Sequence, residues 1–112
     1  MKTIAVIGDS RGIGEALRNQ LLADGHQVIG VSRTGSSATG NYTSVSKDVV
    51  EEAIDLGEYT EQLDGLVYCP GSITLKPFQS LKEEQVMLDL KVNYVGAFMK
   101  CTAQFEIPEE RK

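Results

Sequence analysis

Ile4-Ala5-Val6-Ile7-Gly8-Asp9-Ser10-Arg11-Gly12-Ile13-Gly14 is the stretch of sequence that decides the fold. A short apolar run, typical of a strand buried in a parallel sheet, leads directly into three spaced glycines. Beyond them, Ile13, Leu17 and Leu21 recur every four residues, which predicts a helix packed on that sheet. Gly25 stands where such a helix ends. Strand, glycine-rich turn and helix are therefore expected in immediate succession.

The alternation of strand-like and helical apolar spacing continues along the chain. Further strands are predicted at residues 27–32, 42–45 and 66–69. Residues 51–63 are expected to form a helix with acidic residues in its first turn, and from residue 81 one or two helices are expected, which Pro108 must end. This alternation predicts an α/β protein with a doubly wound parallel sheet in a three-layer α/β/α arrangement. We expect a sheet of the Rossmann type, which has the strand order 3-2-1-4.

The length and composition predict a single soluble domain over residues 1–112. The chain is 41% hydrophobic and 24% charged, with a net charge of −5, and this acidic balance argues against a nucleic-acid partner. Its apolar runs are too short for a signal peptide or a membrane span, so a cytoplasmic protein is expected. Cys69 and Cys101 lack metal-ligand spacing with His26 and the density of a disulfide framework, so we expect free thiols and no metal.

Three glycines, Gly8, Gly12 and Gly14, are placed as they are in turns that bind an anion. A glycine at the strand end allows a tight turn, a second lets the backbone approach a pyrophosphate, and a third lets the helix pack closely on the sheet. Free backbone N–H groups and the positive end of the helix dipole then favour a phosphate. The alternative is a tight strand-to-helix connection that binds nothing.

The spacing G-x-x-x-G-x-G resembles the fingerprint of short-chain dehydrogenases/reductases, in the Ser-Arg-Gly-Ile-Gly form found in NADPH-dependent reductases. Three later segments resemble the same family in the same order. They are Lys47-Asp48-Val49, Cys69-Pro70-Gly71, where the family has Asn-Ala-Gly, and Asn93-Tyr94-Val95-Gly96. The resemblance covers residues 1 to about 103 and leaves 104–112 as a charged tail unlike the family's continuation.

The resemblance implies which residues meet a dinucleotide cofactor and which one takes part in the reaction. The residues expected to bind the cofactor are Gly8, Ser10, Arg11, Gly12, Ile13, Gly14, Ser32, Arg33, Thr34, Asp48, Val49, Cys69, Pro70 and Gly71. Asp48 would accept a hydrogen bond from the adenine amino group, although it fits a helix N-cap equally well. Asn93 would belong to the catalytic tetrad and hold a water in the proton relay.

The cofactor preference is predicted from the end of the second strand. An acidic residue there would bind the ribose 2′-hydroxyl of NAD, whereas this chain has Ser32-Arg33-Thr34. Arg33 and Arg11 would hold the 2′-phosphate of NADP(H), which we expect to be preferred over NAD(H); the alternative is that both are ordinary surface side chains. Asp9 is unexplained, because it places a negative charge beside the expected anion site.

The family's Tyr-x-x-x-Lys pair, which with a serine performs the chemistry, occurs nowhere in the 112 residues. Two functions stay open. The chain is either the NADP(H)-binding portion of an oxidoreductase that transfers hydride between NADPH and a carbonyl or alcohol, or a non-catalytic module that binds a nucleotide or a partner chain. In both cases the fourth strand would expose an apolar edge, so self-association as a dimer or larger oligomer is expected.

Overall fold

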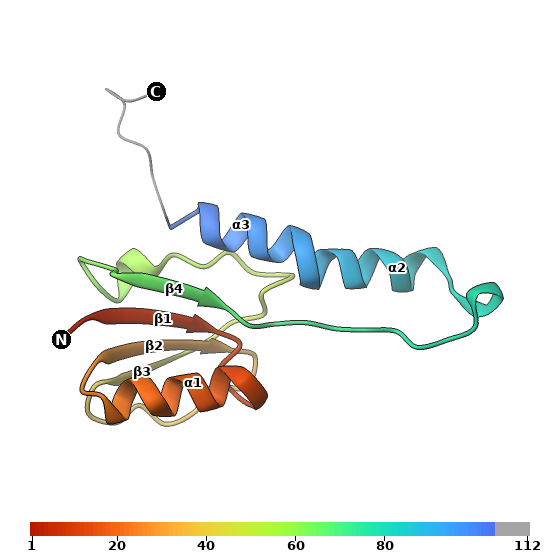
Figure 1. Cartoon of the computed structure of the whole chain (residues 1–112). Helices are drawn as coiled ribbons and strands as arrows, with labels where there is room; N and C mark the ends of the chain where they lie inside the picture. Colours follow the sequence, from red (N-terminus) through yellow and green to blue (C-terminus); the bar gives the residue numbers. More distant parts are fainter. Residues whose placement is uncertain (105–112) are drawn as a thin grey trace, which may run out of the picture.

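A parallel sheet of four strands forms the centre of the computed structural model, which describes residues 1–104 (Figure 1). The strands are β1 (Thr3–Ile7), β2 (Gln27–Ser32), β3 (Tyr42–Ser46) and β4 (Gly65–Tyr68). Their order is β3-β2-β1-β4 and each neighbouring pair is parallel, which confirms the order expected from the sequence. All the strands therefore end at one edge, the carboxyl edge, where the loops that follow them come together.

The central strands are buried on both faces of the sheet. Ala5 and Ile7 of β1 belong to one apolar cluster, and Val6 between them belongs to the other. The first cluster is completed by Ile54 and Leu56, which come from the chain after β3. Because successive side chains of a strand point to opposite faces, burial on both sides requires the continuous apolar run seen in the sequence.

Helix α1 (Gly12–Ala23) covers the second face of the sheet, as its apolar spacing predicts. Leu17 and Leu21 pack against the cluster around Val6, and Gly25 follows the helix with a left-handed backbone. Ile13 does not share this role, because its side chain is 82% exposed. The prediction was wrong for Ile13 because the first turn of α1 lies at the carboxyl edge, where no apolar layer within residues 1–104 covers it.

The helix expected over residues 51–63 is not formed, and only a single 3₁₀ turn, η1 (Leu56–Glu58), lies in that segment. Ile54 and Leu56 are both buried in the core, and a helix would point residues two apart to different sides. Asp55 accepts a hydrogen bond from the N–H of Gly57 at 2.9 Å, and this local bond competes with helix formation.

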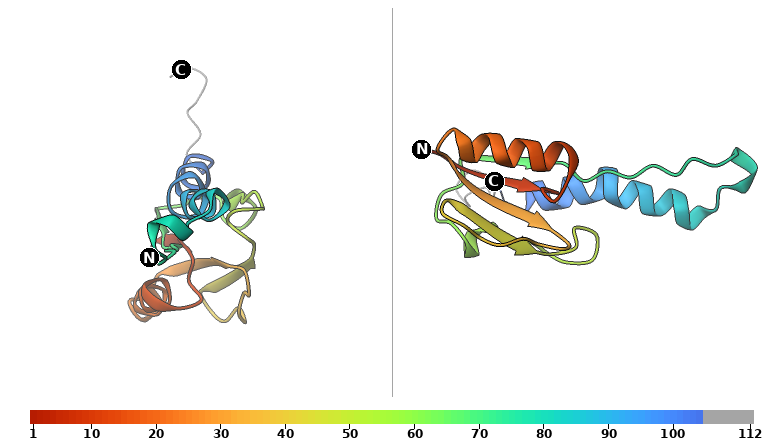
Figure 2. Two further views of the ribbon diagram at one scale, coloured as in Figure 1. Left: turned by 90° about the vertical axis from the view of Figure 1, so that its right-hand side faces the viewer. Right: turned by 90° about the horizontal axis from the view of Figure 1, so that it is seen from below.

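The chain after β4 ends in a helical segment made of three parts, in agreement with the predicted helices. A short 3₁₀ turn, η2 (Phe78–Ser80), precedes α2 (Glu83–Leu90), the π-helical turn η3 (Lys91–Val95) and α3 (Gly96–Thr102). In Figures 1 and 2, α3 lies beside β4, while α2 extends past the carboxyl edge of the sheet. Pro108, which was expected to end the helices, lies outside the described residues.

Gln104 fastens the end of this helical segment to the core. Its side-chain oxygen accepts a hydrogen bond from the N–H of Leu56 at 3.0 Å, and its side-chain nitrogen donates to the carbonyl of Ile54 at 2.7 Å. Position 104, where the sequence predicts that a charged tail begins, is thus integrated into the fold. The rest of that tail, 105–112, lies outside the described residues.

The face of the molecule around β4 and the helical segment is rich in exposed apolar groups. Val95 is 45% exposed, Met99 is 54% exposed, and every residue of β4 is only half-buried. Within residues 1–104, β4 has a single neighbouring strand, so its other edge is open. Among residues 1–104, none of the helices combines the length and the apolar composition that a membrane span requires.

We expect Leu56→Ala to lower the free energy of unfolding by about 2–5 kcal/mol, because it leaves a cavity beneath the sheet. Leu75→Ala is the matched control: Leu75 is 82% exposed, and its truncation should change stability by less than about 0.5 kcal/mol. Urea unfolding followed by circular dichroism measures both. Equal effects of the two substitutions would contradict the placement of Leu56 in the core.

Candidate functional site

The glycines of the turn between β1 and α1 determine how closely the helix approaches the strand. Gly8 and Gly12 have φ angles of 83° and 63°, in the left-handed region that favours glycine. A Cβ on Gly14 would collide with the carbonyl oxygen of Gly8, so the first turn of α1 lies directly on the end of β1. Arg11 precedes the helix and its side chain makes no capping hydrogen bond. The backbone donors at this helix end therefore have no side-chain cap.

The turn after β4 lies against the glycine turn. The N–H of Cys69 donates to the carbonyl of Ile7 at 2.8 Å, which carries the chain past the end of β1. A Cβ on Gly8 would lie 2.9 Å from Cδ of Pro70, a distance that real Cβ contacts do not show. The structure thus brings two of the segments predicted for the cofactor, residues 8–14 and 69–71, into direct contact at the carboxyl edge.

Asn93 lies in the π-helical turn η3, and its side chain holds the segment that follows Gly71. The side-chain oxygen accepts a hydrogen bond from the N–H of Ser72 at 2.8 Å, and the side-chain nitrogen donates to the carbonyl of Ser72 at 2.7 Å. Both polar ends of the amide are therefore bound to one residue of the loop. The Asn93 side chain therefore connects η3 to the loop after β4.

Tyr68 supplies a second link between β4 and the same helical turn, which the sequence analysis missed. Its hydroxyl donates to the carbonyl of Val92 at 2.6 Å, and burial raises the pKa of this hydroxyl. A Cβ on Gly96 would lie 2.6 Å from the same hydroxyl oxygen, so only glycine lets the helix approach this closely. The glycine three residues after Asn93 was the available signal.

The carboxylate of Asp48 is used within its own loop. One oxygen accepts from the N–H of Val50 at 2.8 Å and from that of Glu51 at 3.4 Å. This is the capping arrangement that the sequence left open, although the backbone it caps is a turn and no helix follows. Val49 is half-buried and packs against the core cluster beneath the sheet.

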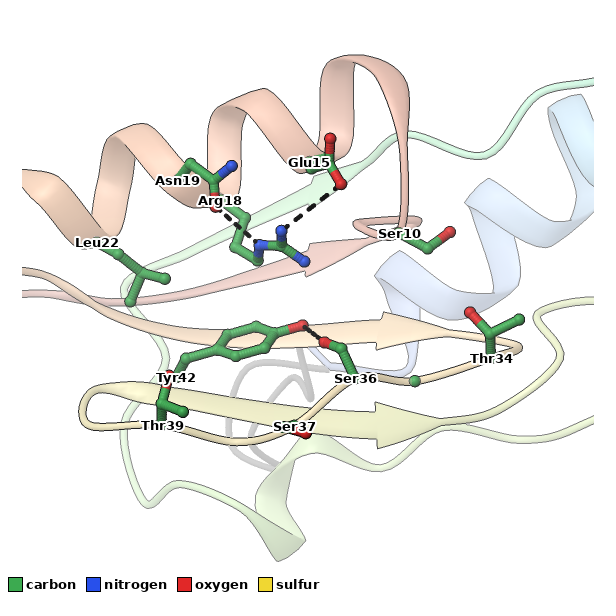
Figure 3. Close-up of a pocket in the computed structure, with 11 residues that line it drawn as sticks. Ser10, Glu15, Arg18, Asn19, Leu22, Thr34, Ser36, Ser37, Thr39 and Tyr42 are labelled. Carbon is green, nitrogen blue, oxygen red and sulfur yellow. Dashed lines mark hydrogen bonds and ion pairs between the residues drawn. The ribbon is translucent and has the colours of Figure 1, made fainter.

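A cleft of about 370 Å³ lies between α1 and the loop that follows β2 (Figure 3). Ser10 and Thr34, both predicted to bind cofactor, line it together with Arg18, Ser36 and Tyr42. Ser10 and Thr34 come from different loops, the glycine turn and the loop after β2, and the cleft brings them to one cavity.

Three more of the predicted residues are close in sequence to residues that line this cleft: Arg11 follows Ser10, and Ser32 and Arg33 precede Thr34. Ser32 is buried, and its hydroxyl accepts a hydrogen bond from the N–H of Gly35 at 2.9 Å, so it shapes the loop. Arg11 and Arg33 are exposed, and neither forms an ion pair with another residue of 1–104.

Asp9 is 1% exposed, and its carboxylate lies against Gly30 of β2 and Arg18 of α1. Its carboxylate accepts a hydrogen bond from the hydroxyl of Tyr42 and lies 3.4 Å from the guanidinium of Arg18. A Cβ on Gly30 would collide with that carboxylate, so the glycine in the middle of β2 makes room for it. Sequence reasoning missed this cluster, although a glycine inside an apolar strand signals the close approach of another group.

Burial and hydrogen bonds shift several pKa values at the carboxyl edge. Burial, followed by the charge of Asp9, raises the pKa of the Cys69 thiol, which therefore stays protonated at neutral pH. Hydrogen bonds from the hydroxyls of Ser72 and Thr74 lower the pKa of Asp89, which is an anion at neutral pH. In the part of the chain that the structure describes, no group of three or more histidine, cysteine, aspartate or glutamate residues could hold a metal ion.

Comparison with known proteins identifies the family. The family described as short chain dehydrogenase matches residues 2–111, so the chain belongs to the short-chain dehydrogenase family. A 3-oxoacyl-[acyl-carrier-protein] reductase, MabA of Mycobacterium tuberculosis, is 31% identical over 103 residues. That match covers 87% of this chain but 41% of the mycobacterial protein, so the chain spans less than half the length of this relative.

Solved structures show the same fold. A short-chain dehydrogenase/reductase from Serratia marcescens superposes with a TM-score of 0.76 at 24% identity, covering 91% of this chain and 50% of that one. A short-chain dehydrogenase from Leptospira borgpetersenii, solved with bound NAD⁺, gives a TM-score of 0.79 at 20% identity, covering 91% of this chain and 44% of that one. At these identities the likeness is one of fold.

We expect Gly14→Ala to destabilise the chain by about 3 kcal/mol, because the new methyl group would meet the backbone of Gly8. The sign is informative, since alanine in place of glycine inside a helix otherwise stabilises by about 1 kcal/mol. Gln20→Ala, an exposed substitution in the same helix, serves as the control in urea unfolding. A Gly14→Ala variant at least as stable as the wild type would contradict the close packing of α1 on β1.

Proposed function

We propose that this chain is the NADP(H)-binding portion of a short-chain dehydrogenase/reductase, whose family reaction transfers hydride between NADPH and a carbonyl or alcohol substrate. The observation that carries the proposal is the left-handed glycine turn, with the uncapped start of α1 packed directly on the end of β1. The 112 residues contain no Tyr-x-x-x-Lys pair, so the role proposed for this chain is to bind the cofactor.

In the proposed complex the pyrophosphate lies at the start of α1. The N–H groups of the first helical turn have no partner within the helix, and the helix dipole adds a partial positive charge. Gly8 and Gly12, whose left-handed backbone favours glycine, have no side chain that would block the ligand. Pro70 and Gly71 would support the cofactor from the side of β4.

The adenosine end of the cofactor is assigned to the cleft between α1 and the loop after β2. Arg11 and Arg33 are exposed and have no ion-pair partner within residues 1–104, so both are available to a dianionic 2′-phosphate. Ser10 and Thr34 line the cleft and add hydroxyl donors. The residues directly after β2 include no carboxylate that would bind the 2′-hydroxyl of NAD(H). We therefore propose NADP(H) as the preferred cofactor and NAD(H) as a weaker one.

Asn93 is assigned to the boundary between cofactor and substrate. In the family this asparagine belongs to the catalytic tetrad. In this chain its side chain is bound at both ends to the backbone of Ser72, so we assign it to holding the loop after β4 in place beside the reaction centre. Hydride transfer in the family also uses a Tyr-x-x-x-Lys pair, which does not occur in residues 1–112.

Self-association in the cytoplasm is the second part of the proposal. Contact with a second chain would bury the open edge of β4 and the exposed apolar side chains of the helical segment. These side chains include Leu88, Val95, Phe98 and Met99. Burial of apolar surface contributes about 25 cal/mol per Å², and a standard interface buries about 1,600 Å² in total. A two-fold dimer that joins the helical segments of two chains would provide that cover with one repeated surface.

We expect the wild type to bind NADP⁺ more tightly than NAD⁺, and Arg33→Ala to weaken NADP⁺ binding about tenfold or more while leaving NAD⁺ binding nearly unchanged. The reason is that a charge-assisted hydrogen bond of about 1.5–3 kcal/mol is available only to the 2′-phosphate. Isothermal titration calorimetry with both cofactors measures this, and Lys2→Ala, which removes the same charge at the opposite edge of the sheet, is the control. Equal wild-type affinities for the two cofactors would overturn the assignment.

We expect the wild type to be a dimer or larger oligomer, and Val95→Asp to dissociate or precipitate it, because the new carboxylate would be buried without a partner in the contact. Gln20→Asp adds the same charge on α1, on the other side of the sheet, and should leave the assembly intact. Light scattering after size-exclusion chromatography gives the mass. A stable, soluble wild-type monomer at micromolar concentration would contradict the proposed interface.

A further inference from the structure

A cluster of three side chains, Asp9, Arg18 and Tyr42, lies behind the glycine turn, and none of the three is among the residues assigned above to hold the cofactor, although Arg18 and Tyr42 line the cleft. The carboxylate of Asp9, 1% exposed, is bound by the hydroxyl of Tyr42 and by the guanidinium of Arg18 at 3.4 Å. Arg18 also donates to the backbone carbonyl of Asp9 at 3.2 Å, and its guanidinium lies 5.2 Å from the centre of the Tyr42 ring. Each member of the cluster therefore contacts the other two.

The cluster is a costly arrangement for a simple turn. A carboxylate removed from water loses its hydration, and this loss is offset only when the group is fully paired and hydrogen-bonded. Gly30 lacks a side chain at the point in β2 where a Cβ would collide with the carboxylate of Asp9. Asp9 thus occupies the space that a side chain at position 30 would need, and its contacts link α1, β2 and β3.

The hydroxyl of Tyr42 connects the two loops that line the cleft. On one side it binds Asp9, which stands between Gly8 and Ser10 in the glycine turn. On the other side it lies 3.1 Å from the hydroxyl oxygen of Ser36, in the loop after β2 (Figure 3). The N–H of Ser36 in turn donates to the hydroxyl of Ser44 on β3 at 2.8 Å, which fixes that part of the loop.

We propose that Asp9, Tyr42 and Arg18 form a positioning device that fixes the glycine turn relative to the loop after β2, and thereby sets the preference for a cofactor with a 2′-phosphate. This inference rests on the proposed function, in which Arg11 of the turn and Arg33 of the loop hold that phosphate from two sides. A 2′-phosphate needs both loops at the correct separation. NAD(H), which lacks the phosphate, depends much less on that separation.

The direction in which Asp9→Asn changes the affinity for NADP⁺ separates this positioning role from a simple effect of charge. A carboxylate close to the cleft would repel a dianionic phosphate, so if its charge dominated, Asp9→Asn would strengthen the binding of NADP⁺. If the carboxylate acts by holding Tyr42 and Arg18 in place, Asp9→Asn weakens the binding of NADP⁺, because an amide is a poorer acceptor than a carboxylate for both donors.

Tyr42→Phe and Asp9→Asn, each made singly, test the proposal when their affinities for NADP⁺ and for NAD⁺ are measured by titration. Tyr42→Phe keeps the ring beneath Arg18 and removes the hydroxyl that joins the loops. For Tyr42→Phe and for Asp9→Asn we expect about a tenfold loss of NADP⁺ affinity with less than about a twofold change for NAD⁺. Tyr59→Phe, at an exposed tyrosine outside the cluster, is the matched control and should change neither affinity.

A second readout needs no ligand. Amide hydrogen exchange of the free chain, followed by NMR, should accelerate in Tyr42→Phe at both Gly12 and Ser36, which lie in the two loops, and stay unchanged there in Tyr59→Phe. A purely structural role for the cluster would lower stability and leave the ratio of the two cofactor affinities at its wild-type value.

The outcomes distinguish this inference from the proposed function. A wild type that prefers NADP⁺, with the same preference kept in Tyr42→Phe, overturns the inference alone. Tighter binding of NADP⁺ by Asp9→Asn also overturns the inference alone, because charge would then outweigh positioning. A wild type that binds both cofactors equally, or neither, overturns the proposed function and the inference with it.

Discussion

The contact between the first turn of α1 and the end of β1 is the constraint on which the rest of the structure depends. Because Gly14 has no side chain, the helix packs on the carbonyl of Gly8, and its uncapped start lies at the carboxyl edge of the sheet. Helix α1 then covers one face of the sheet through Leu17 and Leu21. The cleft beside the loop after β2 and the phosphate site that we propose both follow from this one close approach.

A second close approach organises the other half of the carboxyl edge. Gly96 lets the helical segment pack on Tyr68, whose hydroxyl binds the π-helical turn, and Asn93 from the same turn clamps the backbone of Ser72. The loop after β4 is thereby held against the glycine turn through Pro70. Both halves of the site depend on glycines that let backbone and side chains approach closely, and hydrogen bonds then hold the parts together.

The elements that could be predicted from the sequence are those with strong periodicity. The continuous apolar runs indicated strands buried on both faces, and the strand-helix-strand unit of β1, α1 and β2 indicated a parallel sheet. The expected helix over 51–63 failed because Ile54 and Leu56, two residues apart, are both needed in the core. The burial of Asp9 could not be read from local pattern, since its partners Arg18 and Tyr42 come from other elements and meet it only in the folded chain.

An NMR titration of the ¹⁵N-labelled chain with NADP⁺ tests the central claim most directly, because backbone amides at the start of α1 are the proposed phosphate donors. We expect the largest shift changes at the amides of Gly12, Ile13 and Gly14, with a second group in the loop from Arg33 to Ser36. Titration with NAD⁺, which has the same adenosine but no 2′-phosphate, should reproduce the first group and give clearly smaller changes in the second, above all at Arg33. Shift changes confined to other parts of the chain, or none at millimolar cofactor, would contradict the account.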